Sequence, residues 1–93
     1  MPSSRPTQPQ PIPVERIQTG VRLEKRLVKV LKALAETKDL SLGDLLEGIV
    51  LHAFEGKPAF SNETLAMIAK LKEIYGFDLD AEASHRLTDR KGV

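Results

Sequence analysis

The sequence predicts a mostly α-helical fold in which each chain contributes one strand and two helices, followed by a helical extension. Residues 16–23 alternate between apolar and polar side chains, as expected for a half-buried strand. Residues 24–36 and 42–55 each carry an apolar stripe at helical spacing. Because the chain has a single strand, we expect that strand to pair with its copy in a second chain, giving an intermolecular two-stranded antiparallel ribbon.

Composition excludes several classes of protein. The chain has 93 residues, of which 41% are hydrophobic and 29% charged, as in an ordinary globular domain. Its longest apolar runs are far shorter than a membrane helix requires. The absence of cysteine excludes a disulfide framework, a thiolate metal site and a cysteine nucleophile. Residues 1–13 lack the apolar core of a signal peptide, so export is not expected.

Proline content and periodicity divide the chain into three parts. Residues 1–14 hold five of the six prolines and are predicted to be a disordered tail. Residues 15–56 contain the strand and the two helices, the second capped by Ser41 and ended by Gly56 and Pro58. Residues 57–93 form the extension, with a third helix over 62–75 that is capped by Ser61 and a short helix starting near Asp80.

The small size of the strand-helix-helix unit also favours an obligate homodimer. A unit of about 40 residues buries too little apolar surface to be stable alone. The two helices would cover the apolar face of the ribbon and place Val21 in the core between them. The apolar stripe of the third helix must pack on this dimer or on a partner protein; the stripe comprises Leu65, Ile68, Leu71 and Tyr75.

Charge is distributed unevenly along the chain. Residues 1–32 contain seven Arg or Lys residues against two acids, whereas residues 33–93 contain seven against eleven. This polarity favours contact between the N-terminal part and a polyanion. Lys25 and Arg26 strengthen the interpretation, because cations in the first turn of a helix oppose its dipole. If no neighbouring group compensates for this unfavourable placement, the two cations indicate a phosphate nearby.

The strand, the two helices and the Ser-capped turn between them resemble the ribbon-helix-helix family of bacterial repressors, the Arc/MetJ/CopG group. The resemblance rests on the strand Gln18–Leu23, the helix 24–36, the turn ending at Leu40–Ser41 and the helix 42–55. It covers about 40 of the 93 residues. Gly20 departs from the family pattern, because the family usually has a base-reading side chain at this position.

The resemblance implies a dimer whose ribbon lies in the major groove of double-stranded DNA. Carried over by position, the base contacts would come from Gln18, Gly20 and Arg22. Arginine can bond guanine, and glutamine adenine, in bidentate fashion. Phosphate contacts are expected from two sets of groups, namely the side chains of Arg16, Lys25 and Arg26, and the start of the second helix at Ser41, Leu42 and Gly43.

No residue pattern indicates catalysis or a bound cofactor. His52 and His85 lack metal-site spacing. The acids at 78, 80 and 82 do not make a calcium loop, because Ala83 stands where that loop needs glycine. We therefore expect no enzyme activity, no cofactor and no metal.

The leading hypothesis is a cytoplasmic protein of the bacterial nucleoid that binds double-stranded DNA sequence-specifically as a homodimer. It would act as a transcriptional repressor or autoregulator. Two other roles stay open: an antitoxin, whose acidic extension would bind a toxin, and a plasmid partition factor. No membrane contact is expected. The alternative is a protein-interaction and dimerisation module that does not bind DNA.

Overall fold

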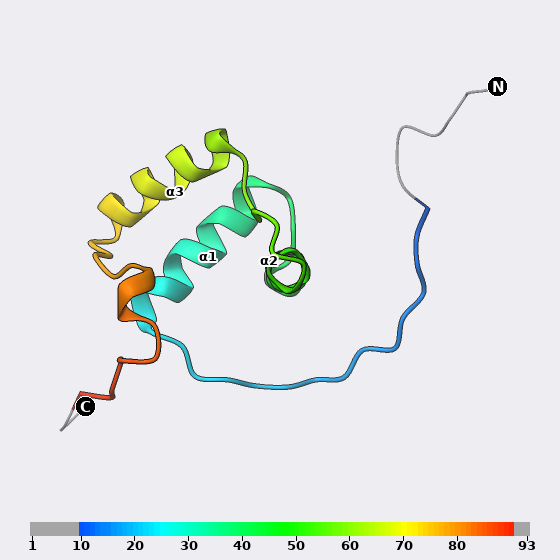
Figure 1. Ribbon diagram of the computed structural model, residues 1–93, viewed down its shortest axis with the longest axis horizontal. Helices are drawn as coiled ribbons and strands as arrows, with labels where there is room; N and C mark the ends of the chain where they lie inside the picture. The colour runs from blue at the N-terminus through cyan, green and yellow to red at the C-terminus, as the bar shows by residue number, and fades with distance from the viewer. Residues whose placement is uncertain (1–9, 91–93) are drawn as a thin grey trace.

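The computed structural model describes residues 10–90, and these residues form three α-helices of equal length and one short 3-10 helix. The helices are α1 (Lys25–Thr37), α2 (Leu42–Phe54) and α3 (Asn62–Ile74), and the 3-10 helix is η1 (Ala81–Ala83). Figure 1 shows α1 between the other two, with α2 seen almost along its axis. Helix α1 packs against both α2 and α3.

The predicted strand is wrong, and with it the ribbon-helix-helix fold class. Residues 10–24 are extended without strand pairing, and the described part of the chain contains no sheet. Ile17 and Val21, expected in the core, are 83% and 75% exposed. Alternation gives a segment an apolar side, but a strand also needs a neighbouring strand to receive its backbone hydrogen bonds. Residues 10–90 offer no second strand, and Figure 1 shows the segment running clear of the three helices for most of its length.

The three predicted helices are confirmed to within one residue at each end. Their starts follow side-chain caps: Ser41 Oγ accepts a hydrogen bond from the Asp44 N–H, and Ser61 Oγ accepts one from the Thr64 N–H. A capping oxygen satisfies one of the unpaired amides in the first turn of a helix. Helix α1 is capped by Glu24, whose carboxylate accepts a hydrogen bond from the Leu27 N–H at 2.8 Å.

Two glycines follow the helix ends as expected. Gly56 and Gly76 have φ values of +68° and +62°. This left-handed conformation is easily adopted by glycine because it has no Cβ. The chain can therefore reverse direction directly after α2 and again after α3.

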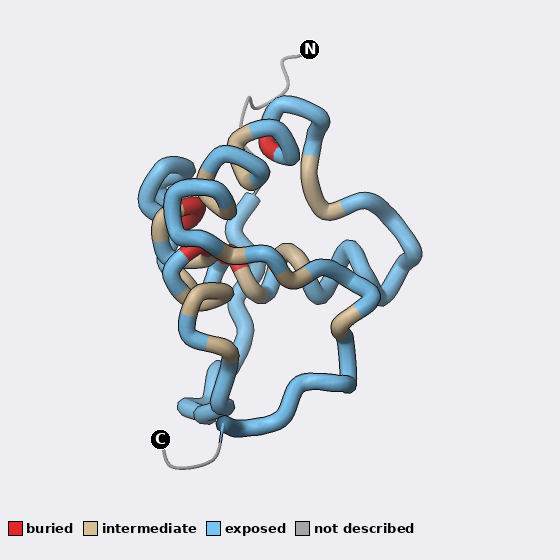
Figure 2. The backbone as a smooth tube through the Cα atoms, turned by 90° about the vertical axis from the view of Figure 1, so that its left-hand side faces the viewer, coloured by how far each residue is buried: buried red, intermediate tan, exposed pale blue. Residues whose placement is uncertain are grey.

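The core is small and lies where α1 meets its two neighbours. The buried apolar side chains are Val30, Leu34 and Ala35 of α1 and Leu45 of α2. Half-buried residues of α3, among them Ile68 and Leu71, pack against this group. The stripe predicted on the third helix is thus covered in part by α1 of the same chain. In Figure 2 the few buried positions lie on the helices, and the extended segment is exposed throughout.

After α3 the chain returns toward the start of α1. Asp80 caps η1 by accepting from the Glu82 N–H, so the predicted short helix is a single 3-10 turn. Residues 86–90 have no regular structure, and Asp89 reaches Arg22 just before α1. Of the tail predicted over 1–14, only residues 10–14 lie within the described range, where they are extended and exposed. No helix within residues 10–90 has the length and apolar character needed to cross a membrane.

Candidate functional site

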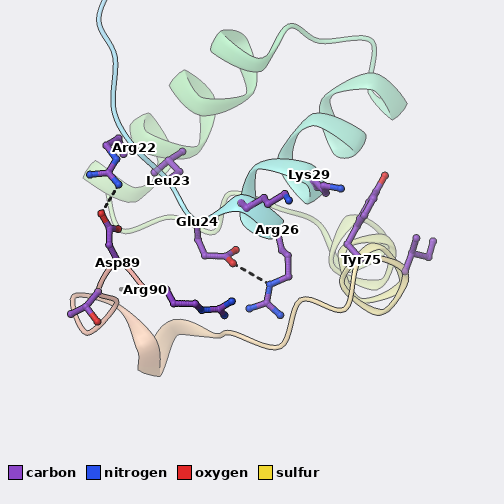
Figure 3. A pocket seen from close by; sticks show the side chains of 11 residues that line it. Arg22, Leu23, Glu24, Arg26, Lys29, Tyr75, Asp89 and Arg90 are labelled. Atoms are coloured by element: carbon purple, nitrogen blue, oxygen red, sulfur yellow. Dashed lines mark hydrogen bonds and ion pairs between the residues drawn. The ribbon is translucent and has the colours of Figure 1, made fainter. Parts of the chain in front are cut away.

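An open groove of about 850 Å³ lies at the N-terminal end of α1 (Figure 3). Three parts of the chain form its walls: the end of the extended segment with the first turn of α1, the end of α3, and the C-terminal segment. The lining residues are Arg22, Leu23, Glu24, Lys25, Arg26, Lys29, Ile74, Tyr75, Thr88, Asp89 and Arg90.

The groove is electropositive. Five of its lining side chains are cationic and two are carboxylates, an excess of three positive charges. Figure 3 shows Arg90 extending from the C-terminal segment toward Arg26 and Glu24. A concave surface lined mainly by one sign of charge concentrates the opposite ion. The arrangement suits an anionic ligand.

Glu24 compensates for one of the two cations in the first turn of α1. Its carboxylate accepts hydrogen bonds from the Leu27 N–H and, at 3.1 Å, from Arg26 Nε. Partial burial acts to raise the pKa of Glu24, but these hydrogen bonds and the Arg26 charge outweigh it, so the pKa lies below its usual value. The expectation that both cations stand without local compensation is therefore wrong for Arg26, whereas Lys25 forms no salt bridge within residues 10–90.

Arg26 is held by the protein itself. Its NH1 donates to the Gly76 carbonyl oxygen at 2.6 Å and lies 3.4 Å from an Asp78 carboxylate oxygen. Its guanidinium also lies 5.7 Å from the centre of the Phe77 ring. With these contacts and the Glu24 bond, Arg26 joins the start of α1 to the chain after α3. Its predicted phosphate contact would have to compete with them.

Arg22 forms an ion pair with Asp89 on the rim of the groove (Figure 3). The two side chains are 86% and 74% exposed. An ion pair this accessible to water contributes little to stability and exchanges readily for another partner. Arg22 is therefore available to an incoming anion.

Three lysines form an exposed stripe on α1, which we call the lysine stripe: Lys25, Lys29 and Lys32. Their spacing of four and three residues places them on one face of the helix. Lys29 Nζ lies 5.9 Å from the centre of the Tyr75 ring in the groove. Within residues 10–90 none of the three takes part in a salt bridge. From the sequence, Lys25 is predicted to contact phosphate, whereas Lys29 and Lys32 could extend that stripe or be ordinary surface lysines.

Arg16 lies at a different place, beside α2. Its Nε and NH2 donate to the two carboxylate oxygens of Glu47 at 2.9 and 2.8 Å, and its NH2 lies 3.8 Å from Asp44. The hydrogen bonds from Arg16 hold the pKa of Glu47 below its usual value, and the Glu47 carboxylate raises the pKa of Arg16. Arg16 is therefore fully charged and neutralises Glu47.

The start of α2 is a poor phosphate site in this arrangement. Ser41 caps the helix, and the amides of Leu42 and Gly43 belong to its first turn. Two carboxylates, Asp44 and Glu47, lie beside the single cation Arg16, and the excess negative charge repels anions. The predicted contacts are thus divided between two places: Arg22, Lys25 and Arg26 line the groove, whereas Arg16, Ser41, Leu42 and Gly43 lie near α2. Gln18 and Gly20 lie on the exposed segment between them.

Several groove residues were missed by the sequence analysis. Tyr75 was assigned to an apolar stripe, and Thr88, Asp89 and Arg90 were not considered as site residues. The signal that could have indicated them is charge: the acids of the extension were interpreted as a surface for a partner protein. Asp78 and Asp89 instead pair with arginines of the basic segment of the same chain.

Within the described residues, no group of three or more His, Cys, Asp or Glu side chains is placed to hold a metal ion. Comparison of the chain with protein-family models, with curated proteins and with solved structures gives no match. The function is therefore argued from the groove and the lysine stripe.

Proposed function

We propose that this protein binds double-stranded DNA through the lysine stripe of α1 and the basic groove beside it. The observation that carries the proposal is the stripe itself. Lys25, Lys29 and Lys32 are exposed, and the described part of the chain gives them no carboxylate partner. Neutralising phosphates with such side chains releases bound counterions, which drives binding to DNA.

The spacing of the stripe suits a duplex backbone. An α-helix rises about 1.5 Å per residue, so Lys25 and Lys32 are separated by roughly 10 Å along the axis of α1. Each DNA strand presents one phosphate about every 3.4 Å along the duplex axis. One helix face can therefore serve several neighbouring phosphates of one strand. Arg22 and Arg90 on the groove rim extend the same surface.

Base contacts are proposed for the extended segment. Gln18 and Arg22 are exposed on a stretch of chain that has no regular structure. Extended basic arms can follow a DNA groove and reach base edges there. Gly20, between them, has open space where a Cβ would stand, so the backbone can approach a groove closely. In this proposal the segment recognises the base sequence by itself, without pairing with a second strand.

The biological role that we propose for this binding is transcriptional repression or autoregulation in the bacterial nucleoid. What supports it is the exposed basic surface formed by the lysine stripe and the groove. Identifying the neighbouring gene would distinguish a stand-alone repressor from an antitoxin or a partition factor.

The test is a salt titration of duplex binding by fluorescence anisotropy. The variant Lys25→Ala/Lys29→Ala/Lys32→Ala removes the stripe. If each lysine neutralises one phosphate, the slope of log K against log salt falls by about 2.7 per chain. The loss should be equal for random and specific duplexes, because phosphate contacts carry no sequence information.

The matched control is Lys38→Ala/Lys57→Ala/Lys70→Ala. It removes the same charge from exposed positions outside the groove lining. We expect its salt slope to equal that of the wild type. If the salt slope fell equally in both triple variants, the effect would be due to net charge alone. The assignment of the lysine stripe as the DNA-binding surface would then be wrong. Absence of duplex binding by the wild type in low salt would leave the protein-interaction module as the function.

A further inference from the structure

Helix α2 is apolar on two sides, but its own chain covers just one of them. Toward α1, Leu45 is buried and Ile49 is half-buried. Away from α1, Val50, Leu51 and Phe54 are 44%, 64% and 81% exposed. A helix that is apolar all round its circumference is normally buried on all sides. The outer side of α2 is therefore a surface that lacks its cover.

Two acids, Asp44 and Glu47, lie at the start of this outer stripe, and Arg16 pairs with Glu47 while lying 3.8 Å from Asp44. Glu47 precedes Val50, Leu51 and Phe54 by three, four and seven residues, which is the spacing of a single helix face. Arg16 holds its carboxylate through two hydrogen bonds of 2.9 and 2.8 Å. Arg16 therefore offsets the charge of Glu47, the acid next to the exposed apolar residues of the stripe.

The same ion pair draws the extended segment against α2. Val14 and Ile17, within two residues of Arg16, are 62% and 83% exposed. They are exposed apolar side chains on the segment that Arg16 connects to α2. We define the α2 outer face as Val14, Ile17, Val50, Leu51 and Phe54.

We propose that the α2 outer face binds the same face of a second copy of this chain. Its five side chains expose on the order of 100 Å² each, or about 500 Å² per chain. A stable interface buries about 800 Å² per partner, of which rather more than half is apolar. The available surface matches what one dimer contact needs. It also lies within the range of roughly 300–600 Å² that the largest apolar patch of a monomer reaches, and patches of that size often mark an interaction site.

Two features favour a second copy over another partner. A contact about a two-fold axis brings each patch against itself, and a patch made of five apolar side chains is complementary to its own copy. The chain also needs additional burial, because the buried apolar core of the described residues consists of four side chains, of which Leu34 is the most completely buried. Packing of two α2 helices supplies that burial to both copies at once. The contact is made by helix faces and requires no strand.

Sedimentation velocity provides the first test. At about 10 μM we expect the wild-type chain to sediment at twice its mass of 10.3 kDa. Phe54→Glu places a charge on the α2 outer face and should raise the dimer dissociation constant at least tenfold. Leu65→Glu, at an apolar position of α3 that is 50% exposed, is the matched control and should remain dimeric. A wild-type chain that stays monomeric up to about 100 μM would overturn the proposal.

Cross-linking provides a second test that does not depend on how a charged variant folds. The chain contains no cysteine, so one introduced thiol reports on one position. Under mild oxidation, Leu51→Cys should form covalent dimers, whereas Leu65→Cys should not. Equal cross-linking of the two variants would show that the α2 outer face is not the dimer contact and would refute the proposal. Neither test contains DNA, so both outcomes are separate from those of the binding assay.

Discussion

The three helices and the extended segment before them use their apolar residues in opposite ways. In α1, Val30, Leu34 and Ala35 are at most 5% exposed. In the segment, Ile17 and Val21 are more than 70% exposed, although their spacing is equally regular. A helix completes its backbone hydrogen bonds internally, whereas a strand depends on a neighbour. An apolar pattern at helical spacing is therefore enough to predict a helix, whereas alternation alone is not enough to predict a strand.

The largest expected effect separates these two regions directly. Leu34→Ala creates a cavity at a side chain that is 1% exposed, and it should cost roughly 2–5 kcal/mol of unfolding free energy. Val21→Ala, at a position that is 75% exposed, should change stability by less than about 0.5 kcal/mol. Urea denaturation measured at one low protein concentration gives both values. A large cost at Val21 would mean that the segment is covered in the folded protein.

The next effect tests whether the segment acts through its charges. Arg22→Ala should weaken binding to a specific duplex about tenfold, because a bidentate base contact is worth roughly 1–3 kcal/mol. Asp89→Asn should do the opposite and strengthen binding, since it releases Arg22 from its ion pair. Anisotropy titrations at about 0.15 M salt compare the two.

Glu82→Gln is the control for Asp89→Asn. It removes the same charge from η1, and Glu82 does not line the groove. At about 0.15 M salt, charges separated by more than about 8 Å are largely screened, so binding should stay unchanged. If Glu82→Gln and Asp89→Asn strengthen binding equally, Arg22 is not held back by Asp89 in particular.

A smaller effect concerns the junction between the two regions, where Glu24 caps α1. The native pKa of Glu24 is below its usual value, so the capping free energy is present above the ordinary pKa of about 4.3 and is lost as the pH falls through the native pKa. Glu24→Gln should therefore cost about 1 kcal/mol at pH 7 and nothing in strong acid. Thermal unfolding followed from pH 7 to pH 2 measures the difference.

Glu36→Gln, at an exposed position of the same helix, is the matched control for this profile. Its difference from the wild type should stay small and nearly constant with pH. A Glu24→Gln cost that persists in acid would show that the carboxylate charge does not provide the cap.

The smallest effect compares two glycines with open space around them. Gly48 lies inside α2, and Gly20 lies in the extended segment; neither would bring a Cβ within 4 Å of another atom. Gly48→Ala should stabilise the protein by roughly 0.5–1 kcal/mol, because alanine loses less backbone entropy in a helix. Gly20→Ala should leave the unfolding midpoint almost unchanged. A stabilisation of similar size at Gly20 would indicate that the segment is ordered in the folded state.

The sequence was sufficient to predict the helices because their signals are local. The apolar stripe of α1 and the caps Ser41 and Ser61 lie within a few residues of the backbone they organise. The candidate site was predicted in part. The contact that joins Arg22 to Asp89 spans 67 residues, and the one that joins Arg16 to Glu47 spans 31. Opposite charges so far apart along the chain have many possible partners, so the sequence does not indicate which of them meet.

The central position of α1 has a consequence for motion. Helices α2 and α3 both pack on α1, and in the described part of the chain their backbones make no close approach to each other. Either outer helix can therefore separate from α1 while the other stays in place. Local opening would then proceed through two nearly independent units, with the backbone amides of α1 the last to exchange with solvent. A ligand that holds the end of α3 at the groove would slow one opening and leave the other free.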